Sequence, residues 1–107
     1  MIDVATSKRL EMLLKVTSSA NADSFAWYAL GMELRALGRI DEAFEAFRRI
    51  REKDPAYVPA YQMCGMMLID AGRRDEAKEW LSRGVETAQR SGNAKAATEM
   101  QEALAGL

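Results

Sequence analysis

The sequence predicts an all-α protein built from stacked helical hairpins, and three observations lead to this fold class. First, residues 24–57 align with residues 58–91 without a gap, and 12 of the 34 aligned residues are identical. A period of this length is typical of helical solenoids. Second, apolar residues recur at helical spacing in both halves of the alignment. Third, 49% of the residues are apolar and 29% are charged, which is a globular composition.

The first expected helix spans about residues 7–17. It carries apolar side chains at Leu10, Leu13, Leu14 and Val16. Its register is that of the second helix of an incomplete repeat, and we expect it to cap the apolar end of the stack. The polar stretch TSSANADS follows as a linker, with Ser24 as the expected N-cap of the next helix.

The first full hairpin is expected over residues 24–57. Its first helix carries apolar side chains at Trp27, Leu30, Leu34 and Leu37. Gly38 is suited to the left-handed residue that ends a helix, and Asp41 is a candidate N-cap for the second helix. That helix must end near Asp54, because the following proline disfavours helical backbone in the residue before it.

The second full hairpin is expected over residues 58–91. Gln89 stands where the first hairpin has a proline, so the second helix is expected to continue to about Arg90. Gly31 and Gly65 recur inside the first helix of each hairpin, where glycine costs ~1 kcal/mol relative to alanine. Their recurrence predicts helices that cross too closely to admit a Cβ atom.

A final helix is expected over about residues 94–106, as a C-terminal cap. Its apolar side chains follow i, i+3, i+7, i+10 spacing, at Ala97, Met100, Leu104 and Leu107. The chain is therefore predicted to be a single domain, residues 1–107, with six helices. They form an N-terminal capping helix, two hairpins and a C-terminal capping helix.

The repeated residues resemble the tetratricopeptide repeat, whose pattern runs W-x2-L-G-x2-Y, then A-x3-F, then P. The first repeat matches this pattern at Trp27, Leu30, Gly31, Ala43, Phe47 and Pro55. The second repeat keeps Tyr61, Gly65, Ala77 and Leu81. It departs from the pattern at Cys64, where leucine is usual, and at Gly84, where alanine is usual. The resemblance implies a right-handed solenoid in which the first helix of each hairpin lines a concave groove.

The first helices carry more apolar surface than a core needs, which predicts an interface on the concave side. FAWYALGMELRAL has only Glu33 and Arg35 as charged residues, and AYQMCGMMLIDA has only Asp70. Exposed apolar surface of this extent marks binding sites, and methionine repacks around varied partners. The resemblance places these residues in the groove: Phe25, Tyr28, Met32, Arg35, Gln62, Met63, Met66 and Ile69.

Three occupants of this groove stay open at this point. They are a peptide or helix of a partner protein, a second copy of the chain in a homodimer, and the chain's own C-terminal helix. Arg35 is suited to hold a partner's carboxylate through two N–H groups. Tetratricopeptide domains that grip the C-terminal carboxylates of heat-shock chaperones use a lysine and two asparagines where this chain has Tyr28, Met32 and Met63. The resemblance therefore does not extend to that ligand.

Enzyme chemistry finds little support in the residue types. The chain has no histidine, so the commonest general base and metal ligand is absent. Cys64 lies in an apolar helix and is expected to be buried. The acidic pairs at 41–42 and 75–76 are expected at helix starts, where carboxylates are stabilised by the free N–H groups. We expect a non-enzymatic adaptor with no catalytic residue, no cofactor and no metal site.

Nucleic-acid and membrane binding are also disfavoured. The basic residues of segment 48–53 spread around their helix, and Glu45 and Glu52 stand at pairing distance in sequence. A solvated face is therefore expected there, with nucleic-acid binding as a remote alternative. The net charge is −1, and no apolar run reaches the ~20 residues of a membrane span. We expect a cytoplasmic protein, in which Trp80 packs beneath a neighbouring helix.

Overall fold

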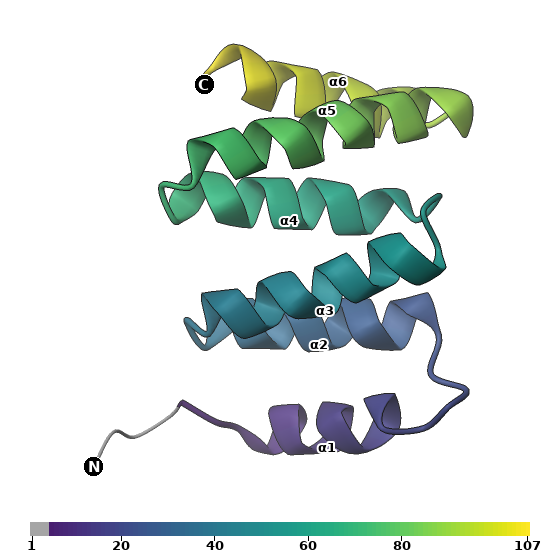
Figure 1. The fold of residues 1–107 in the computed structure, drawn as a ribbon, viewed down its shortest axis with the longest axis vertical. Helices are drawn as coiled ribbons and strands as arrows, with labels where there is room; N and C mark the ends of the chain where they lie inside the picture. Colours follow the sequence, from purple (N-terminus) through teal and green to yellow (C-terminus); the bar gives the residue numbers. More distant parts are fainter. Residues whose placement is uncertain (1–4) are drawn as a thin grey trace.

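Residues 5–107, described by a computed structural model, form six α-helices and no strand. The helices are α1 (Lys8–Thr17), α2 (Ser24–Ala36), α3 (Ile40–Lys53), α4 (Val58–Asp70), α5 (Arg74–Arg90) and α6 (Ala94–Ala105). They stack in chain order along the longest axis of the molecule, from α1 at one end to α6 at the other (Figure 1). The predicted all-α helical-repeat fold is confirmed. Residues 1–4, which the expected domain includes, lie outside the described residues.

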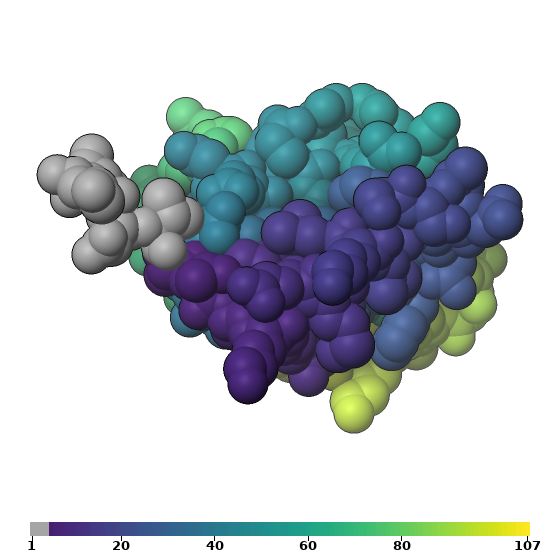
Figure 2. All heavy atoms as spheres, turned by 90° about the horizontal axis from the view of Figure 1, so that it is seen from below, coloured from purple at the N-terminus to yellow at the C-terminus, as the bar shows by residue number. Residues whose placement is uncertain are grey.

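The helices form two layers, an inner layer of α2, α4 and α6 and an outer layer of α1, α3 and α5. Consecutive inner helices approach within 8 Å between Cα atoms, whereas consecutive outer helices within residues 5–107 do not. The stack is therefore tighter on its inner side, which makes the surface of the inner layer the concave one. Figure 2 views the stack from the end at which α1 forms the outermost layer.

The reversals between helices depend on glycines in the left-handed region. Gly38 and Gly72 both have φ of 75° and follow α2 and α4. The N–H of Arg39 donates to the carbonyl of Leu34 across the first of these turns, at 2.9 Å. This bond uses a carbonyl that the helix end leaves free. The expectation for Gly38 is confirmed, and the same turn recurs 34 residues later.

The two predicted N-caps, Ser24 and Asp41, are wrong. Asp23, one residue before the expected Ser24, caps α2 by accepting a hydrogen bond from the N–H of Ala26 at 2.9 Å. Asp41 and Asp75 lie within the first turns of α3 and α5 instead of at the N-caps. At α3 and α5, one residue after the left-handed glycine completes the turn, so each of these helices starts before its aspartate. The carboxylates still stabilise the free N–H groups through their charge.

Both mid-helix glycines lie at close helix crossings, as predicted. A Cβ atom on Gly31 would lie 2.6 Å from Cε1 of Phe47, and one on Gly65 would lie 2.5 Å from Cδ2 of Leu81. Real Cβ atoms do not approach other atoms this closely. The first helix of each hairpin can therefore lie directly on the second helix, with Phe47 or Leu81 of the second helix against the glycine of the first.

The two terminal helices cap the stack to different degrees. Helix α6 buries Ala96, Ala97 and Met100 against α5 and α4, and exposes a polar side. Among the helices of residues 5–107, α1 lies against α2 alone and buries Leu10 there. Leu14 is 49% exposed, because no other helix of this range covers the flank of α1 on which it lies.

Ion pairs tie the outer layer together between the two hairpins. Arg51 on α3 donates to both carboxylate oxygens of Glu79 on α5, at 2.7 and 3.0 Å. Arg73, just before α5, donates to Asp41 on α3 at 3.0 Å. These bonds join helices whose backbones are not in contact, so charged side chains bridge the wider, outer side of the stack.

Candidate functional site

The predicted groove residues lie on α2 and α4, and three of them expose apolar side chains. Phe25 is 68% exposed, Met32 is 39% exposed and Met66 is 40% exposed. Met32 and Met66 occupy the same position of the two repeats, so they stand on neighbouring inner helices. We call the surface formed by the eight predicted residues the inner face. Its exposed apolar side chains are available for contact with a partner.

Two polar side chains of the inner face, Arg35 and Gln62, already have partners within the chain. Arg35 on α2 donates to Asp70 on α4 at 2.8 Å and also contacts the sulfur of Met63. Gln62 donates to Glu99 on α6 at 3.0 Å. Arg35 thus holds the carboxylate of Asp70 from its own chain, and not that of a partner. A ligand carboxylate would have to displace this exposed pair, which is a weak interaction in water.

Tyr28 supports the inner face from beneath. Its ring packs edge-on against Tyr57, with ring centroids 5.9 Å apart, and lies 6.1 Å from the ring of Phe47. Burial raises the pKa of Tyr28, although the charge of Arg35 acts in the opposite direction. Tyr28 is half-buried, as are Gln62, Met63 and Ile69. The solvent-facing part of the inner face is therefore concentrated at the three apolar side chains.

Helix α6 touches the inner face through the bond between Glu99 and Gln62, but it does not cover the exposed methionines. It packs on α5 and α4 as the next member of the inner layer, and it leaves Met32 and Met66 exposed. Of the three occupants considered from the sequence, the chain's own C-terminal helix is the one that this arrangement contradicts. The apolar side chains of α6, Ala96, Ala97 and Met100, are already buried elsewhere, and Met100 is fully buried beside Gly84 of α5.

A second surface feature could not be seen in the sequence. A cleft of about 490 Å³ opens between α1, α2 and α3, with Leu14, Trp27, Leu30 and Leu34 among its lining residues. We call it the outer cleft. It arises because α1 stays away from α3. The pattern of a single helix does not reveal such a separation.

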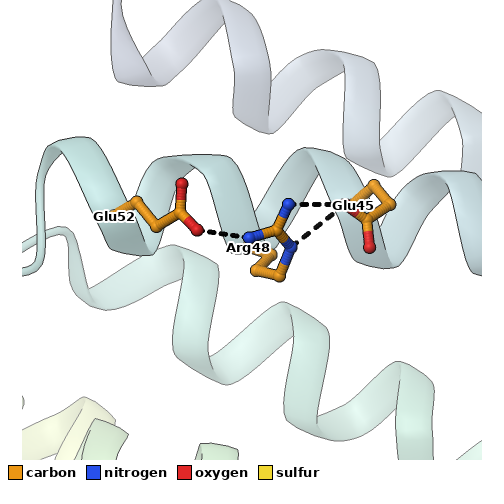
Figure 3. A network of polar contacts seen from close by, with 3 residues as sticks. All are labelled: Glu45, Arg48 and Glu52. Atoms are coloured by element: carbon orange, nitrogen blue, oxygen red, sulfur yellow. Dashed lines mark hydrogen bonds and ion pairs between the residues drawn. The ribbon is translucent and has the colours of Figure 1, made fainter.

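Two of the four basic residues in segment 48–53 pair with carboxylates, and Arg48 does so with the flanking glutamates, as predicted. Arg48 lies between Glu45 and Glu52 on the same helix and pairs with both (Figure 3). Arg51 pairs with Glu79 on α5. The guanidinium of Arg49 lies over the ring of Trp27, 4.4 Å from its centroid. These contacts distribute the positive charge among acidic and aromatic partners, which disfavours a continuous phosphate-binding surface.

Other reactive features are inert in this arrangement. Cys64 is fully buried, and desolvation raises the pKa of its thiol to about 12, so little thiolate forms near neutral pH. Trp80 is buried, as predicted. Within residues 5–107, no group of three or more His, Cys, Asp or Glu side chains is arranged to hold a metal ion. No helix in the same range is both long and apolar enough to cross a bilayer.

The family follows from the repeats themselves. The family model described as tetratricopeptide repeat matches residues 34–105. The chain belongs to the tetratricopeptide repeat family. The structural basis is the pair of glycine-based hairpins described above, and the fold is one that serves in general for protein–protein interaction. No curated protein matches the chain.

Solved structures of similar chains agree with this assignment. A solution structure of a tetratricopeptide repeat domain protein from Salinibacter ruber is 30% identical, with a TM-score of 0.76, and the match covers 82% of this chain and 89% of that one. A crystal structure of a tetratricopeptide repeat domain protein from the same organism is 31% identical, with a TM-score of 0.72, and the match covers 78% and 93%. A protein from Bordetella parapertussis, 23% identical with a TM-score of 0.78, shares the fold over 92% of this chain and 86% of its own.

Proposed function

We propose that this tetratricopeptide repeat protein is a non-enzymatic adaptor that captures a helix or extended peptide of a partner protein on its inner face. The observation that carries the proposal is the exposure of three large apolar side chains, Phe25, Met32 and Met66, on two adjacent inner helices. Large apolar side chains grouped on a concave surface favour a contact with another protein.

The chemistry of the inner face favours an apolar ligand. The polar groups of Arg35 and Gln62 are held by Asp70 and Glu99, so a partner gains most by covering the methionines and Phe25. Methionine side chains adapt to the shape of the partner. The inner layer is held on the outer layer by fully buried residues such as Phe47 and Leu81, which makes the inner face a preformed surface. A preformed surface loses little conformational entropy on binding.

A second copy of the chain is the other occupant considered for the inner face. Symmetric dimers bury the same patch on both subunits, so Met32 and Met66 would then be covered in the dimer. Light scattering at two protein concentrations that differ tenfold distinguishes a dimer from a monomer with a free inner face. We expect a monomer that binds peptide. If the protein is instead a dimer, and if Met32→Glu/Met66→Glu dissociates it, the inner face serves self-association.

The decisive experiment is a matched pair of variants. A peptide is selected from a random displayed library and titrated by fluorescence anisotropy against the wild type and the Met32→Glu/Met66→Glu double variant. We expect binding to weaken about 30-fold or more, because a charge in the centre of a desolvated contact costs ~2 kcal/mol or more. Helicity and melting should stay close to wild type, since both side chains contact solvent.

The control is Met12→Glu on α1, because Met12 is 59% exposed and lies outside the inner face. It introduces the same change of side chain and should leave the affinity unchanged. Equal binding of the selected peptide to the wild type and the double variant would show that the peptide does not use the inner face.

A further inference from the structure

We propose that α1 binds an amphipathic helix of a partner protein, on the side of α1 that faces away from α2, and that acidic residues flank the apolar stripe of this partner helix. The binding surface lies at the end of the stack that Figure 2 shows, and the proposal is independent of the inner face. It rests on a comparison of α1 with the two other outer helices.

The three outer helices differ in the inner helices that they contact. Helix α3 contacts both α2 and α4, and α5 contacts both α4 and α6. Among the helices of residues 5–107, α1 contacts α2 alone. The contact that α1 lacks is the one that α3 makes with α2 and that α5 makes with α4, which is the contact with the first helix of the same hairpin. One side of α1 is therefore left without a neighbouring helix of this range.

The uncovered side of α1 carries large apolar side chains at positions that are buried in the next repeat. Met12 is 59% exposed and Val16 is 45% exposed. Moved forward by the repeat period of 34 residues, they align with Ala46 and Ile50 of α3, which are both buried. Ala46 and Ile50 each line a surface depression together with Trp27 of α2. The positions of Met12 and Val16 are thus those at which an outer helix packs on the first helix of its hairpin.

The exposure of these side chains is peculiar to α1 among the outer helices. Within residues 5–107, six large apolar side chains are exposed, and three of them belong to the inner face. The other three are Met12, Leu14 and Val16, all on α1, whereas α3 and α5 expose none. Grouped exposed apolar side chains mark interaction sites, so α1 offers a second such surface.

Basic residues accompany the apolar side chains on this surface. Lys8, Met12, Lys15 and Val16 follow i, i+4, i+7, i+8 spacing, so they lie on one side of the helix. We call this set the α1 face. Lys8 and Lys15 are exposed, and neither forms an ion pair with another of residues 5–107. Glu11 is the only acidic residue of α1. The charge of the α1 face therefore favours a negatively charged partner.

This charge distinguishes between the candidate occupants. In a symmetric dimer through the α1 face, the lysines of the two copies would meet around one apolar contact, and like charges across an interface disfavour binding. Helix α6 of a second copy is also unsuited, because its apolar side chains Ala96, Ala97 and Met100 are buried within its own chain. A partner helix with an apolar stripe between glutamates or aspartates matches both the apolar and the basic groups of the α1 face. Amphipathic helices commonly bind in this way, with their apolar side laid on an apolar surface.

The test uses two labelled peptides of about 18 residues, long enough to form a helix in water. Both carry leucines at i, i+3, i+4 and i+7 spacing. One flanks the leucines with glutamates, and the other has a lysine in place of every glutamate. In a fluorescence-anisotropy titration with the full chain, we expect the glutamate peptide to bind with a dissociation constant on the order of 0.1 mM. The lysine peptide should bind at least about threefold more weakly, because exposed ion pairs contribute modestly.

Two double variants separate the apolar contribution from the charge contribution. Met12→Gln/Val16→Gln should weaken binding of the glutamate peptide about tenfold or more, because it removes the apolar contact. Lys8→Glu/Lys15→Glu should reverse the preference, so that the lysine peptide binds more tightly than the glutamate peptide. All four side chains are exposed, so helicity and melting of both variants should stay close to wild type.

The inner-face variant Met32→Glu/Met66→Glu is the control, and it should bind the glutamate peptide as the wild type does. Failure of the inner-face proposal and failure of this one therefore give different results. Methyl NMR of the wild type supplies a measurement that does not depend on the folding of a variant. The glutamate peptide should shift the methyl signals of Met12 and Val16 saturably.

Four outcomes overturn the proposal. In the first, neither peptide binds saturably, or both bind equally well. In the second, Met12→Gln/Val16→Gln leaves the affinity for the glutamate peptide unchanged. In the third, the methyl shifts appear at Met32 and Met66 instead, which places the peptide on the inner face. In the fourth, the wild type is a dimer that Met12→Gln/Val16→Gln dissociates, because a second copy of the chain then covers the α1 face.

Discussion

Replacing Gly65 by alanine is expected to destabilise this protein, although alanine is the better helix former. The new Cβ atom would lie 2.5 Å from Cδ2 and 2.6 Å from Cγ of Leu81. Leu81 is fully buried, so its side chain has no free space into which to withdraw. The two helices must therefore separate or Leu81 must leave its preferred rotamer.

The magnitude follows from two opposing terms. Alanine in place of glycine inside a helix contributes ~1 kcal/mol of stability. Overpacking a close-packed core costs ~1–3 kcal/mol. Since the overlap at Gly65 approaches a full ångström relative to an ordinary contact of 3.4 Å, we place the overpacking cost at the upper end. The expected net loss is ~1–2 kcal/mol in the free energy of unfolding, or a melting temperature lower by ~4–16 °C.

The assay is urea unfolding followed by circular dichroism, with Gly65→Ala, Leu81→Ala and the double variant compared. Leu81→Ala alone should cost ~2–5 kcal/mol, because it leaves a cavity. In the double variant the new methyl group fills part of that cavity, so the combined loss should be at least ~1 kcal/mol smaller than the sum of the single losses.

Gly106→Ala is the matched control. A Cβ atom there would meet only the carbonyl oxygen of Ala103, at an ordinary 3.6 Å. It should change stability by less than ~0.5 kcal/mol. If Gly65→Ala stabilises the protein, or if its effect adds to that of Leu81→Ala without coupling, the explanation of the repeated glycines as close crossings is wrong.

Two further predictions concern Cys64 and α1. Cys64 should react with thiol reagents only after unfolding, because its side chain is fully buried. Burial raises the pKa of the thiol from the ordinary 9.0 to about 12, so the thiol ionises in the unfolded chain at a lower pH than in the folded one. The free energy of unfolding should therefore fall as the pH rises above 9.0. This loss, up to ~1.4 kcal/mol per pH unit, should be missing in Cys64→Ala, and rapid labelling of the native protein would contradict the placement of the thiol. Deleting residues 1–17 removes the cover that Leu10 gives to α2 and should cost ~2–4 kcal/mol by thermal melting. A truncated chain that melts cooperatively within a few degrees of the full chain would show that α1 is not a cap.

The fold was predictable from the sequence because its determinants are local and repeated. Gly38 and Gly72 set the turns, and Gly31 and Gly65 set the helix crossings. Each hairpin therefore contains the residues that determine its own turn and its own crossing. The N-caps were predicted less well. A turn that ends in a left-handed glycine leaves too little chain for Asp41 to precede its helix, and this depends on backbone geometry that residue preferences alone do not contain.

The candidate site was predictable only in part. Repeat position was sufficient to identify Met32 and Met66 as exposed residues of the inner layer. It did not reveal that Arg35 is held by Asp70, because that pair joins residues 35 positions apart in the chain. The outer cleft depends on the distance between α1 and α3. No periodicity within either helix records that distance, so the sequence contained no signal for it.

The ion pairs across the outer layer help to set the curvature of the stack, because they fix the distance between outer helices. Arg51–Glu79 and Arg73–Asp41 span two helices whose backbones do not touch, whereas the inner helices are in direct contact. A change in the curvature of the stack would therefore alter the distances within these ion pairs more than the contacts between the inner helices. Salt weakens interactions between exposed charges. We therefore expect higher ionic strength to loosen the outer layer and, with it, to change the width of the inner face.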